Sequence, residues 1–250
     1  AFGSSSLRLS YALALSDLIL APATPSNTAR VGGVIMPITT SLAKAFGSEP
    51  QDGPRKIGSF LMQSIYQVNT ITSAMFQTSM AGNTLVAALA LQSFGIGITW
   101  GDWAMAAIVP GIIALIIMPY FIYKVYPPEI KDAREAQQMI KEELKGLGKM
   151  SFQEWVMLGV FVLALVLWAT SQFTKIDATT VAFLGISILL ATGVLIWDDV
   201  KSEKGAWDTL VWMGTLMGFA GFLSKLGFIK WATVLVGGYI PEGSWIIAFV

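Results

Sequence analysis

The feature that most constrains this chain is a proline-rich polar interruption between two apolar arms near its beginning. The interruption, APATPSNTARVGG, covers residues 21–33, and the arms cover residues 11–20 and 34–42. At about 1.5 Å per helical residue, an arm of about 10 residues reaches about 15 Å, half of a hydrocarbon core of about 30 Å. Neither arm can span alone, so we expect a re-entrant hairpin over residues 11–42. Backbone breaks at that depth only where protein or a water-filled cavity surrounds it, which makes the tip a candidate binding site.

Long uncharged runs place the chain among all-α polytopic membrane proteins. Charged residues make up 13% of the sequence, and none occurs from Ile57 to Gly101 or from Trp155 to Thr174. Soluble domains carry about 25%. The sequence has no His and no Cys, which excludes disulfides, thiolate and imidazole metal sites, and His- or Cys-based catalysis. A formal net charge of zero gives no indication of a nucleic-acid partner.

The uncharged run after the hairpin is too long for one straight span. As a single helix it would measure about 67 Å, more than twice the hydrocarbon core. Polar residues gather in its middle, so we expect a broken span over residues 57–94, interrupted near Ser79–Asn83. A further span is expected at 102–124. Opposite charges spaced three and four residues apart predict a solvated helix within a linker at 126–152.

The remaining residues predict the beginning of a second membrane half. Two spans are expected at about 154–171 and 179–197, followed by a turn at 198–205 and another span from near Trp207. Another apolar stretch runs from Phe228 onward. Because the first residues are Ala-Phe-Gly and the last are apolar, we expect the chain to be the interior of a longer protein.

The loop charges predict an orientation. Lys and Arg gather in the loops at 43–56, 125–152 and 198–205, whereas the loops at 95–102 and 172–178 hold only Lys175. A re-entrant hairpin returns to the side it left, which puts the three basic loops on one side. That side is expected to be cytoplasmic, and the linker at 126–152 with it.

Two charged residues lie in the hairpin itself. Asp17 is on the first arm, where a buried acid is costly unless it has a partner or a function. A structural partner such as a nearby Arg, a direct role in transport and exposure at the interface all stay open. Arg30 lies two residues past Thr28, close to the tip. It could act as a fixed cation at the tip in place of a mobile Na⁺, or form a salt bridge with a neighbouring element.

The tip has the chemistry to bind both an anion and a cation. Ser26 and Asn27 can cap the return helix, whose free N–H groups and positive dipole end favour a carboxylate. Pro22 and Pro25 donate no N–H, so carbonyl oxygens at the end of the first arm are left to hold a Na⁺. Ser-Asn-Thr as a bare tripeptide is equally explained by a capped helix in an ordinary loop.

A wider pattern is more specific than the tripeptide. It comprises SDLILAPATPSNTARVGGVIMPI at 16–38, RKIGSFL at 55–61, NTITSAMFQTSMAGN at 69–83, IDATT at 176–180 and GAWDTLVW at 205–212. Together these segments resemble the divalent anion/sodium symporter (DASS) family. The nearest branch is that of the plastid 2-oxoglutarate/malate translocators and the bacterial citrate/succinate and tartrate/succinate antiporters.

That resemblance implies a homodimeric elevator-type transporter with two inverted repeats, each carrying a re-entrant hairpin tipped by Ser-Asn-Thr. Residues 1–125 would be the end of the first repeat and residues 153–250 an incomplete second repeat. The second Ser-Asn-Thr is absent from this chain, so half of the site is represented and we expect no transport by the chain alone.

The resemblance also implies site residues. The implied substrate ligands are Ser26, Asn27, Thr28, Asn83 and Thr84. The implied groups for a cation or for charge balance are Ser26, Asn27, Ser79, Gly82 and Arg30. No cofactor is implied, and Na⁺ is the single candidate ion.

We therefore expect transport of di- and tricarboxylates of the malate, succinate, 2-oxoglutarate and citrate class. Anion exchange is favoured because Arg30 could replace a mobile cation, and Na⁺-coupled symport is the alternative. A membrane-embedded enzyme fits less well without His or a mid-span Asp pair, and a channel would need symmetric polar rings. The expected partners are carboxylate substrates, the lipid bilayer and a second copy of the chain, in a bacterial inner membrane or, alternatively, a plastid inner envelope.

Overall fold

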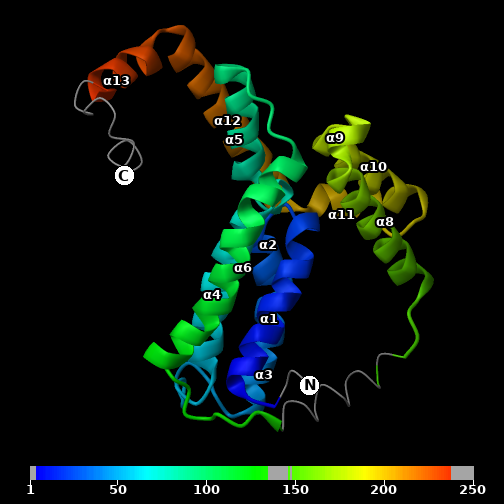
Figure 1. The fold of residues 1–250 in the computed structure, drawn as a ribbon. Helices are drawn as coiled ribbons and strands as arrows, with labels where there is room; N and C mark the ends of the chain where they lie inside the picture. Colours follow the sequence, from blue (N-terminus) through cyan, green and yellow to red (C-terminus); the bar gives the residue numbers. More distant parts are fainter. Residues whose placement is uncertain (1–3, 135–145, 147, 238–250) are drawn as a thin grey trace. The chain divides into compact units, whose positions relative to one another are not determined.

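The computed structural model describes residues 4–134, 146 and 148–237, and its regular elements are helices. The only β-type pairing among these residues is an isolated bridge between Ser5 and Asp132. The chain divides into two compact units, Ala1–Leu195 and Ile196–Val250, which are described separately below (Figure 1). The first unit contains every element that the sequence associates with the candidate site.

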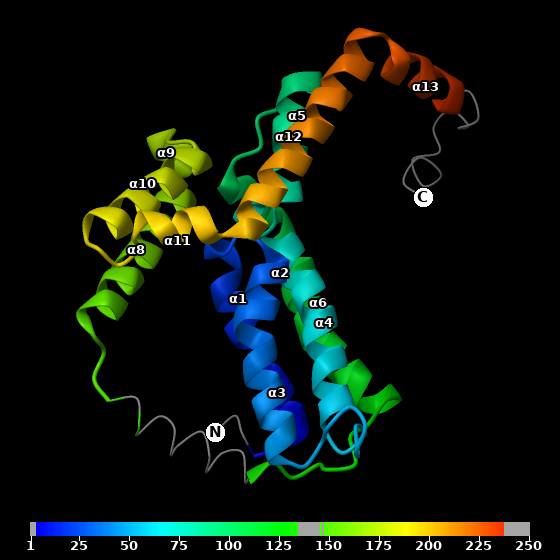
Figure 2. The ribbon, with the colours of Figure 1, turned by 180° about the vertical axis from the view of Figure 1, so that it is seen from behind.

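The first unit opens with two helical arms joined by a break. Helix α1 covers Ser6–Leu20 and is capped by Ser5, whose side chain accepts from the Arg8 amide. A short 3₁₀ turn at Ala21–Ala23 follows, and the chain returns through α2, a π-helical turn and α3, which cover Asn27–Arg30, Val31–Ile35 and Met36–Ala45. Figures 1 and 2 show α1 and α3 side by side, with the break at one end of the pair.

The two arms are longer than the sequence predicted. Helix α1 has 15 residues and extends about 22 Å, and the return run at 27–45 extends about 28 Å. Helix α1 begins at Ser6 because the Ser5 side chain caps it there, and the return run begins at Asn27 because the Ser26 side chain accepts from the Ala29 amide. The break itself lies where the prolines predicted it.

The return arm contains its own irregularity at Val31–Ile35. Pro37 has no N–H and cannot bond to the carbonyl of Gly33, four residues earlier. The helix widens there, and the amide of Met36 bonds to the carbonyl of Val31, five residues back. The Gly32–Gly33 pair lies within this widened turn, where an added Cβ at either glycine would meet no atom within 4 Å.

The long uncharged run is divided as expected, but slightly earlier in the sequence. Helix α4 covers Gly58–Met75, a 3₁₀ turn covers Gln77–Ser79, and α5 covers Ala81–Phe94. The interruption was predicted near Ser79–Asn83, whereas Asn83 lies in the first turn of α5. The break ends sooner because the Asn83 side chain bonds back to α4, as described below.

The other helices of the first unit pack in pairs. Helix α6 covers Trp100–Val125 and begins with a capping box of Thr99 and Asp102. Helices α8, α9 and α10 cover Phe152–Ala169, Ser171–Thr174 and Ala178–Ala191. Helix α6 packs on α4, and α8 on α10. We expected the last of these spans to reach residue 197, but it ends at Ala191, ahead of Gly193 with its positive φ.

The second unit consists of α11, α12 and α13, which cover Trp197–Ser202, Lys204–Lys225 and Phe228–Gly237. A helix therefore occupies much of the segment at 198–205 that was predicted to be a turn, since Asp199 caps it by accepting from the Ile196 amide. The solvated helix expected within the linker at 126–152 lies largely outside the described residues.

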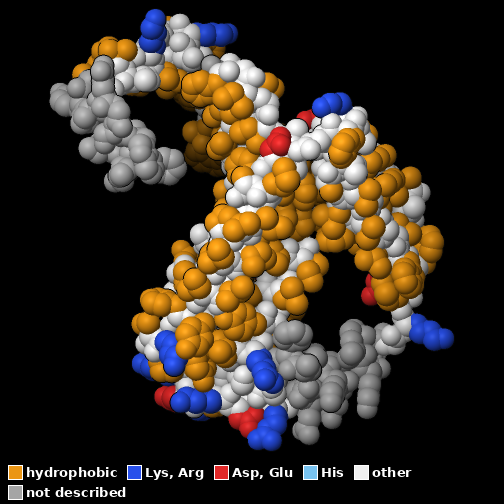
Figure 3. Space-filling view, viewed as in Figure 1, with side chains coloured by type: hydrophobic (Ala, Val, Ile, Leu, Met, Phe, Trp, Pro, Cys, Tyr) orange, Lys and Arg blue, Asp and Glu red, His pale blue; other side chains and the backbone are white. Residues whose placement is uncertain are grey.

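Two described helices are long and apolar enough to cross a membrane, α6 with 26 residues and α8 with 18. The pair α12 and α13, bent by 74°, would count as a third if it forms one span. Figure 3 shows hydrophobic side chains along the flank of the first unit and charged side chains toward its ends. Helix α6 exposes apolar side chains such as Val109, Ile113 and Ile117, as a lipid-facing helix would.

A valine at Gly111 should destabilise the packing of α6 on α4. A Cβ at Gly111 would lie 2.6 Å from Cγ of Met75, which is 2% exposed and has little room to move. We expect Gly111→Val to lower the stability in detergent by about 1–3 kcal/mol, the usual cost of overpacking, measured by thermal unfolding with circular dichroism. Gly159→Val in α8 is the matched control, because an added Cβ there meets nothing within 4 Å. Equal unfolding midpoints for the two variants would contradict the prediction.

Candidate functional site

A buried ion pair lies at the centre of the hairpin. Nε of Arg30 is 2.9 Å from Oδ1 of Asp17, and the two side chains are 0% and 2% exposed. Moving two charges out of water is expensive unless their remaining hydrogen-bonding groups are also satisfied. Asp17 lies near the end of α1 and Arg30 at the end of α2, so the pair joins the two arms next to the break.

All five N–H groups of the Arg30 guanidinium have acceptors. Besides Nε, Nη1 donates to the carbonyls of Thr24 at 3.2 Å and Ser79 at 3.3 Å. Nη2 donates to the hydroxyls of Thr72 at 3.3 Å and Ser73 at 3.0 Å. Thr24 belongs to the hairpin break and Ser79 to the break between α4 and α5. One side chain therefore connects both interruptions of the helical backbone.

The Asp17 carboxylate is satisfied in the same way. Its Oδ1 accepts from Arg30, and its Oδ2 accepts from the hydroxyl of Thr72 on α4. The result is a closed network of two charges that cancel and of neutral hydroxyls and carbonyls around them. This is the salt bridge that stood as the alternative for Arg30, and it supplies the Arg partner that stood as one alternative for Asp17.

A second set of bonds holds the two breaks together. The hydroxyl of Thr78 donates to the carbonyl of Pro22 at 2.5 Å, and Nε1 of Trp100 donates to the Thr78 hydroxyl at 3.0 Å. The Pro22 carbonyl is one of those expected to be left over for a Na⁺, and the Thr24 carbonyl is another. Both already accept a hydrogen bond from a protein side chain, which leaves each of them one lone pair.

Asn83 and Ser79 donate hydrogen bonds to backbone carbonyls at the end of α4. The Asn83 amide nitrogen donates to the carbonyls of Ser73 at 2.7 Å and Phe76 at 2.8 Å. The Ser79 hydroxyl lies 2.5 Å from the same Ser73 carbonyl, and the residue is 0% exposed. Both side chains face the protein. We infer that they fix the shape of the break and that they act on a ligand, if at all, through that shape.

The Ser26, Asn27 and Thr28 side chains lie at the start of the return arm. Oγ of Ser26 accepts from the Ala29 amide at 3.2 Å, and Oδ1 of Asn27 accepts from the Thr28 amide at 2.9 Å. Ser26 and Asn27 are half-buried and Thr28 is exposed. Within the described part of the chain, no acceptor is found for the Ser26 hydroxyl hydrogen. These residues leave polar donors accessible beside the buried network.

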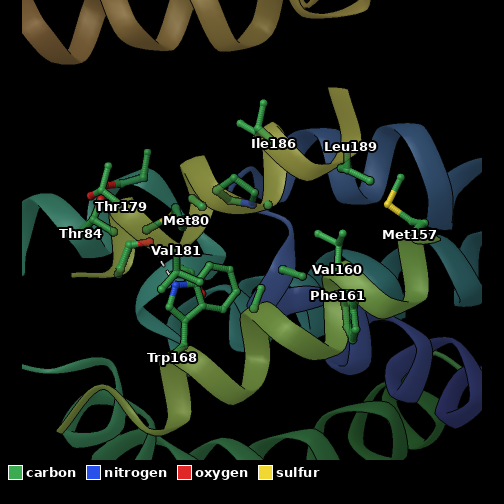
Figure 4. A pocket seen from close by; sticks show the side chains of 18 residues that line it. Met80, Thr84, Met157, Val160, Phe161, Trp168, Thr179, Val181, Ile186 and Leu189 are labelled. Atoms are coloured by element: carbon green, nitrogen blue, oxygen red, sulfur yellow. Dashed lines mark hydrogen bonds between the residues drawn. The ribbon is translucent and has the colours of Figure 1, made fainter. Parts of the chain in front are cut away.

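The remaining predicted residues lie at the start of α5. Thr84 is exposed, and its hydroxyl donates to the Ala81 carbonyl at 2.8 Å. Gly82 is half-buried, and an added Cβ would come within 3.2 Å of the Met80 methyl group. Together with Ala23 and Pro25 from the hairpin break, Thr84 borders a cavity of 410 Å³ whose other wall is formed by α8 and α10 (Figure 4).

The structure brings the predicted residues to two neighbouring breaks, but it divides them into two kinds. Ser26, Asn27, Thr28 and Thr84 are half-buried or exposed, whereas Arg30, Ser79 and Asn83 are buried. The sequence did not single out Thr72, Ser73, Thr78 or Trp100 as parts of the network. The first three lie among the polar residues of an uncharged apolar run, which was the available signal.

The chain is similar to known membrane proteins along its whole length. The sequence-family model for the sodium:sulfate symporter transmembrane region matches residues 1–250. The putative malate transporter YflS of Bacillus subtilis is 51% identical over 250 residues, which is 100% of this chain and 52% of that protein. The inner membrane protein YbhI of Escherichia coli is 45% identical over 248 residues, 99% of this chain and 52% of that protein.

A plant relative is similar over nearly the same region. The chloroplastic dicarboxylate transporter 1 of Spinacia oleracea is 46% identical over 231 residues, which is 92% of this chain and 41% of that protein. The chain thus spans about half the length of the curated relatives it matches. The hairpin, both breaks and the Arg30 network all lie within residues 1–250, which the family model matches.

The buried pair predicts a non-additive mutational effect. Asp17→Asn and Arg30→Gln each leave one buried charge without its partner, so each should cost about 3–5 kcal/mol. The double variant removes both charges and should cost less than the sum, as measured by denaturant titration in mixed micelles. Asp132→Asn is the control, because its pair with Arg134 is exposed and should contribute nothing measurable. Additive losses would show that the two buried charges do not interact.

Proposed function

The chain belongs to the sodium:sulfate symporter transmembrane family, and on that premise we propose that the protein transports di- and tricarboxylates across a membrane. The observation that carries the proposal is the pair of helix breaks joined by Arg30, with accessible polar side chains at the start of the return arm. Interrupted helices whose ends meet within a membrane protein are the usual construction of a transporter substrate site. The names of the malate and dicarboxylate transporters among its relatives support the same substrate class.

A carboxylate would bind to neutral donors at this site. The Ser26 hydroxyl, the Asn27 amide and the Thr28 hydroxyl lie where the return arm begins, and a helix start favours negative charge. Hydrogen bonds from such donors to a charged acceptor are stronger than those between neutral groups. Thr84 would contribute a hydroxyl from the second break. Asn83, Ser79 and Gly82 would hold that break in shape.

The mode of coupling cannot rest on Arg30, whose charge is balanced by Asp17. We keep exchange as the proposal because the chain resembles the exchanger branch of the family. Na⁺-coupled symport is the alternative. Because the Asp17–Arg30 pair has no net charge, another group must balance the charge of the substrate, and a Na⁺ could do so. Among the described residues, no three acidic side chains lie together, so a Na⁺ would be held mainly by neutral oxygens.

The resemblance also supports a proposal for the assembly. We propose a homodimer in which a second, inverted repeat completes the site and an elevator-type movement carries it across the membrane. Transport would then require the full-length protein, and the chain alone would provide half of the site.

Reconstitution of the full-length protein in liposomes tests the function and its coupling. We expect labelled malate to enter liposomes preloaded with malate or 2-oxoglutarate, without a requirement for Na⁺. The controls are liposomes that are preloaded with an unrelated anion in place of the dicarboxylate, and liposomes without protein. Uptake that needs Na⁺ and no internal dicarboxylate would establish symport instead, and no uptake of any di- or tricarboxylate would contradict the proposed function.

The exposed hydroxyl of Thr28 should matter for substrate binding. Thr28→Val keeps the shape of the side chain but removes the donor, and a hydrogen bond to a charged group contributes about 1.5–3 kcal/mol. We expect KM for malate to rise about tenfold or more with little change in folding stability. Thr40→Val is the matched control, because that exposed hydroxyl bonds only to the Met36 carbonyl of its own helix. An unchanged KM in Thr28→Val would show that the Thr28 hydroxyl does not bind the substrate.

A further inference from the structure

A groove between α4 and α6 lies on the surface of the first unit, away from the candidate site. The two helices run side by side (Figures 1 and 2), and the groove between them has a volume of 490 Å³. Its lining includes Ser59, Gln63 and Gln67 from α4, and Met118, Phe121 and Val125 from α6. Ser59 and Gln67 are eight residues apart, which corresponds to about 12 Å along the helix. The groove is therefore polar along one side and apolar along the other.

A basic depression lies beyond the end of α6. It is open, has a volume of 680 Å³ and is lined by Arg55, Glu129 and Lys131 together with two prolines. The segment that forms it is fixed to the residues before α4, because the Glu129 amide donates to the Arg55 carbonyl at 3.0 Å. The three charged residues are exposed, and none of them takes part in the ion pairs found among the described residues. The depression thus offers a ligand two positive charges and one negative charge.

The stacking of Arg55 on Tyr126 joins the basic depression to the groove. Cζ of Arg55 lies 4.3 Å from the centroid of the Tyr126 ring, and Tyr126 also lines the groove. The N–H groups of a guanidinium lie in its own plane, so a guanidinium that stacks on a ring can still donate from its edge. Arg55 therefore presents its donors at the end of the groove, in the fork geometry that binds a phosphate through two oxygens.

The order of groups along this surface matches that of a phospholipid in one leaflet. Helix α6 is long and apolar enough to cross a membrane, so the groove along it lies at the depth of acyl chains and the depression past its end lies at the membrane surface. Between the two, the Ser59 hydroxyl is buried and has no partner among the described residues. The basic loops at this end predict the cytoplasmic side, where basic pockets beside membrane helices bind anionic headgroups.

We propose that the basic depression and the groove together bind one anionic phospholipid. Arg55 and Lys131 hold its phosphate, and Glu129 accepts a hydrogen bond from a hydroxyl of the headgroup. The Gln63 amide donates to an ester carbonyl, and an acyl chain lies against Phe121. A phosphatidylglycerol headgroup has the phosphate and the hydroxyls that these contacts require, whereas a phosphatidylcholine headgroup carries a cation and no hydroxyl. The site is separate from the transport site and does not rest on the proposed function.

The test is lipid binding to the purified full-length protein in detergent, measured by native mass spectrometry. Each basic side chain near a membrane surface strengthens the binding of anionic lipid by about fivefold. We therefore expect phosphatidylglycerol to bind about tenfold or more tightly than phosphatidylcholine with the same acyl chains, and Arg55→Gln/Lys131→Gln to weaken phosphatidylglycerol binding roughly 25-fold. Arg8→Gln/Lys44→Gln is the matched control, because it removes two exposed charges, at the start of α1 and the end of α3, that do not line the depression.

A second pair of variants tests the groove. Gln63→Trp fills the groove without changing any charge, and displacing two methylene groups of the acyl chain should weaken phosphatidylglycerol binding about tenfold. Tyr66→Trp, exposed on the same helix and outside the lining, should bind like the parent protein. Equal binding of the two lipids, as when another part of the protein covers the groove, would overturn the proposal. So would full binding by Gln63→Trp, an equal loss in the Arg8→Gln/Lys44→Gln control, or displacement of the lipid by inorganic phosphate at equal concentration.

Discussion

The rest of the site depends on the ion pair between Asp17 and Arg30. A guanidinium can be buried only when its charge is paired and its donors are satisfied, and Arg30 meets both conditions through five hydrogen bonds. Two of these bonds end on carbonyls that the helix breaks leave free. The pair therefore stabilises interruptions that would otherwise expose unsatisfied backbone within an apolar environment.

This arrangement determines what the site can offer to a substrate. The charges of Asp17 and Arg30 cancel, and the carbonyls of Pro22 and Thr24 each accept a hydrogen bond from a protein side chain. A carboxylate that reaches the breaks meets hydroxyl and amide donors and the start of a helix, and no free guanidinium. Under the proposed function, affinity would come from oriented neutral donors, and the charge of the substrate would be balanced by a counter-ion, a counter-substrate or the other half of the site.

Much of this architecture could be predicted from the sequence because prolines and uncharged runs have strong local meaning. Pro22 and Pro25 indicated the hairpin break, and the polar residues within 57–94 indicated a second one. The partners of Arg30 could not be derived, since the contact between Arg30 and Ser79 joins residues 49 positions apart. The arms were predicted too short because the caps at Ser5 and Ser26 lie outside the apolar stretches, and the sequence could not show that the Asn83 amide bonds back to α4.

The most direct test of the account is the distance between the two breaks when the pair is removed. The chain contains no cysteine, so single cysteines can be introduced for spin labelling at Ala29 on α2 and Val86 on α5, which are both exposed. The distance between the two labels is measured by pulsed electron paramagnetic resonance. We predict one narrow distance distribution in the parent protein and a broader or longer one in the Asp17→Leu/Arg30→Met variant, which leaves no unpaired charge. The same narrow distribution in both proteins would show that the pair does not hold the breaks together.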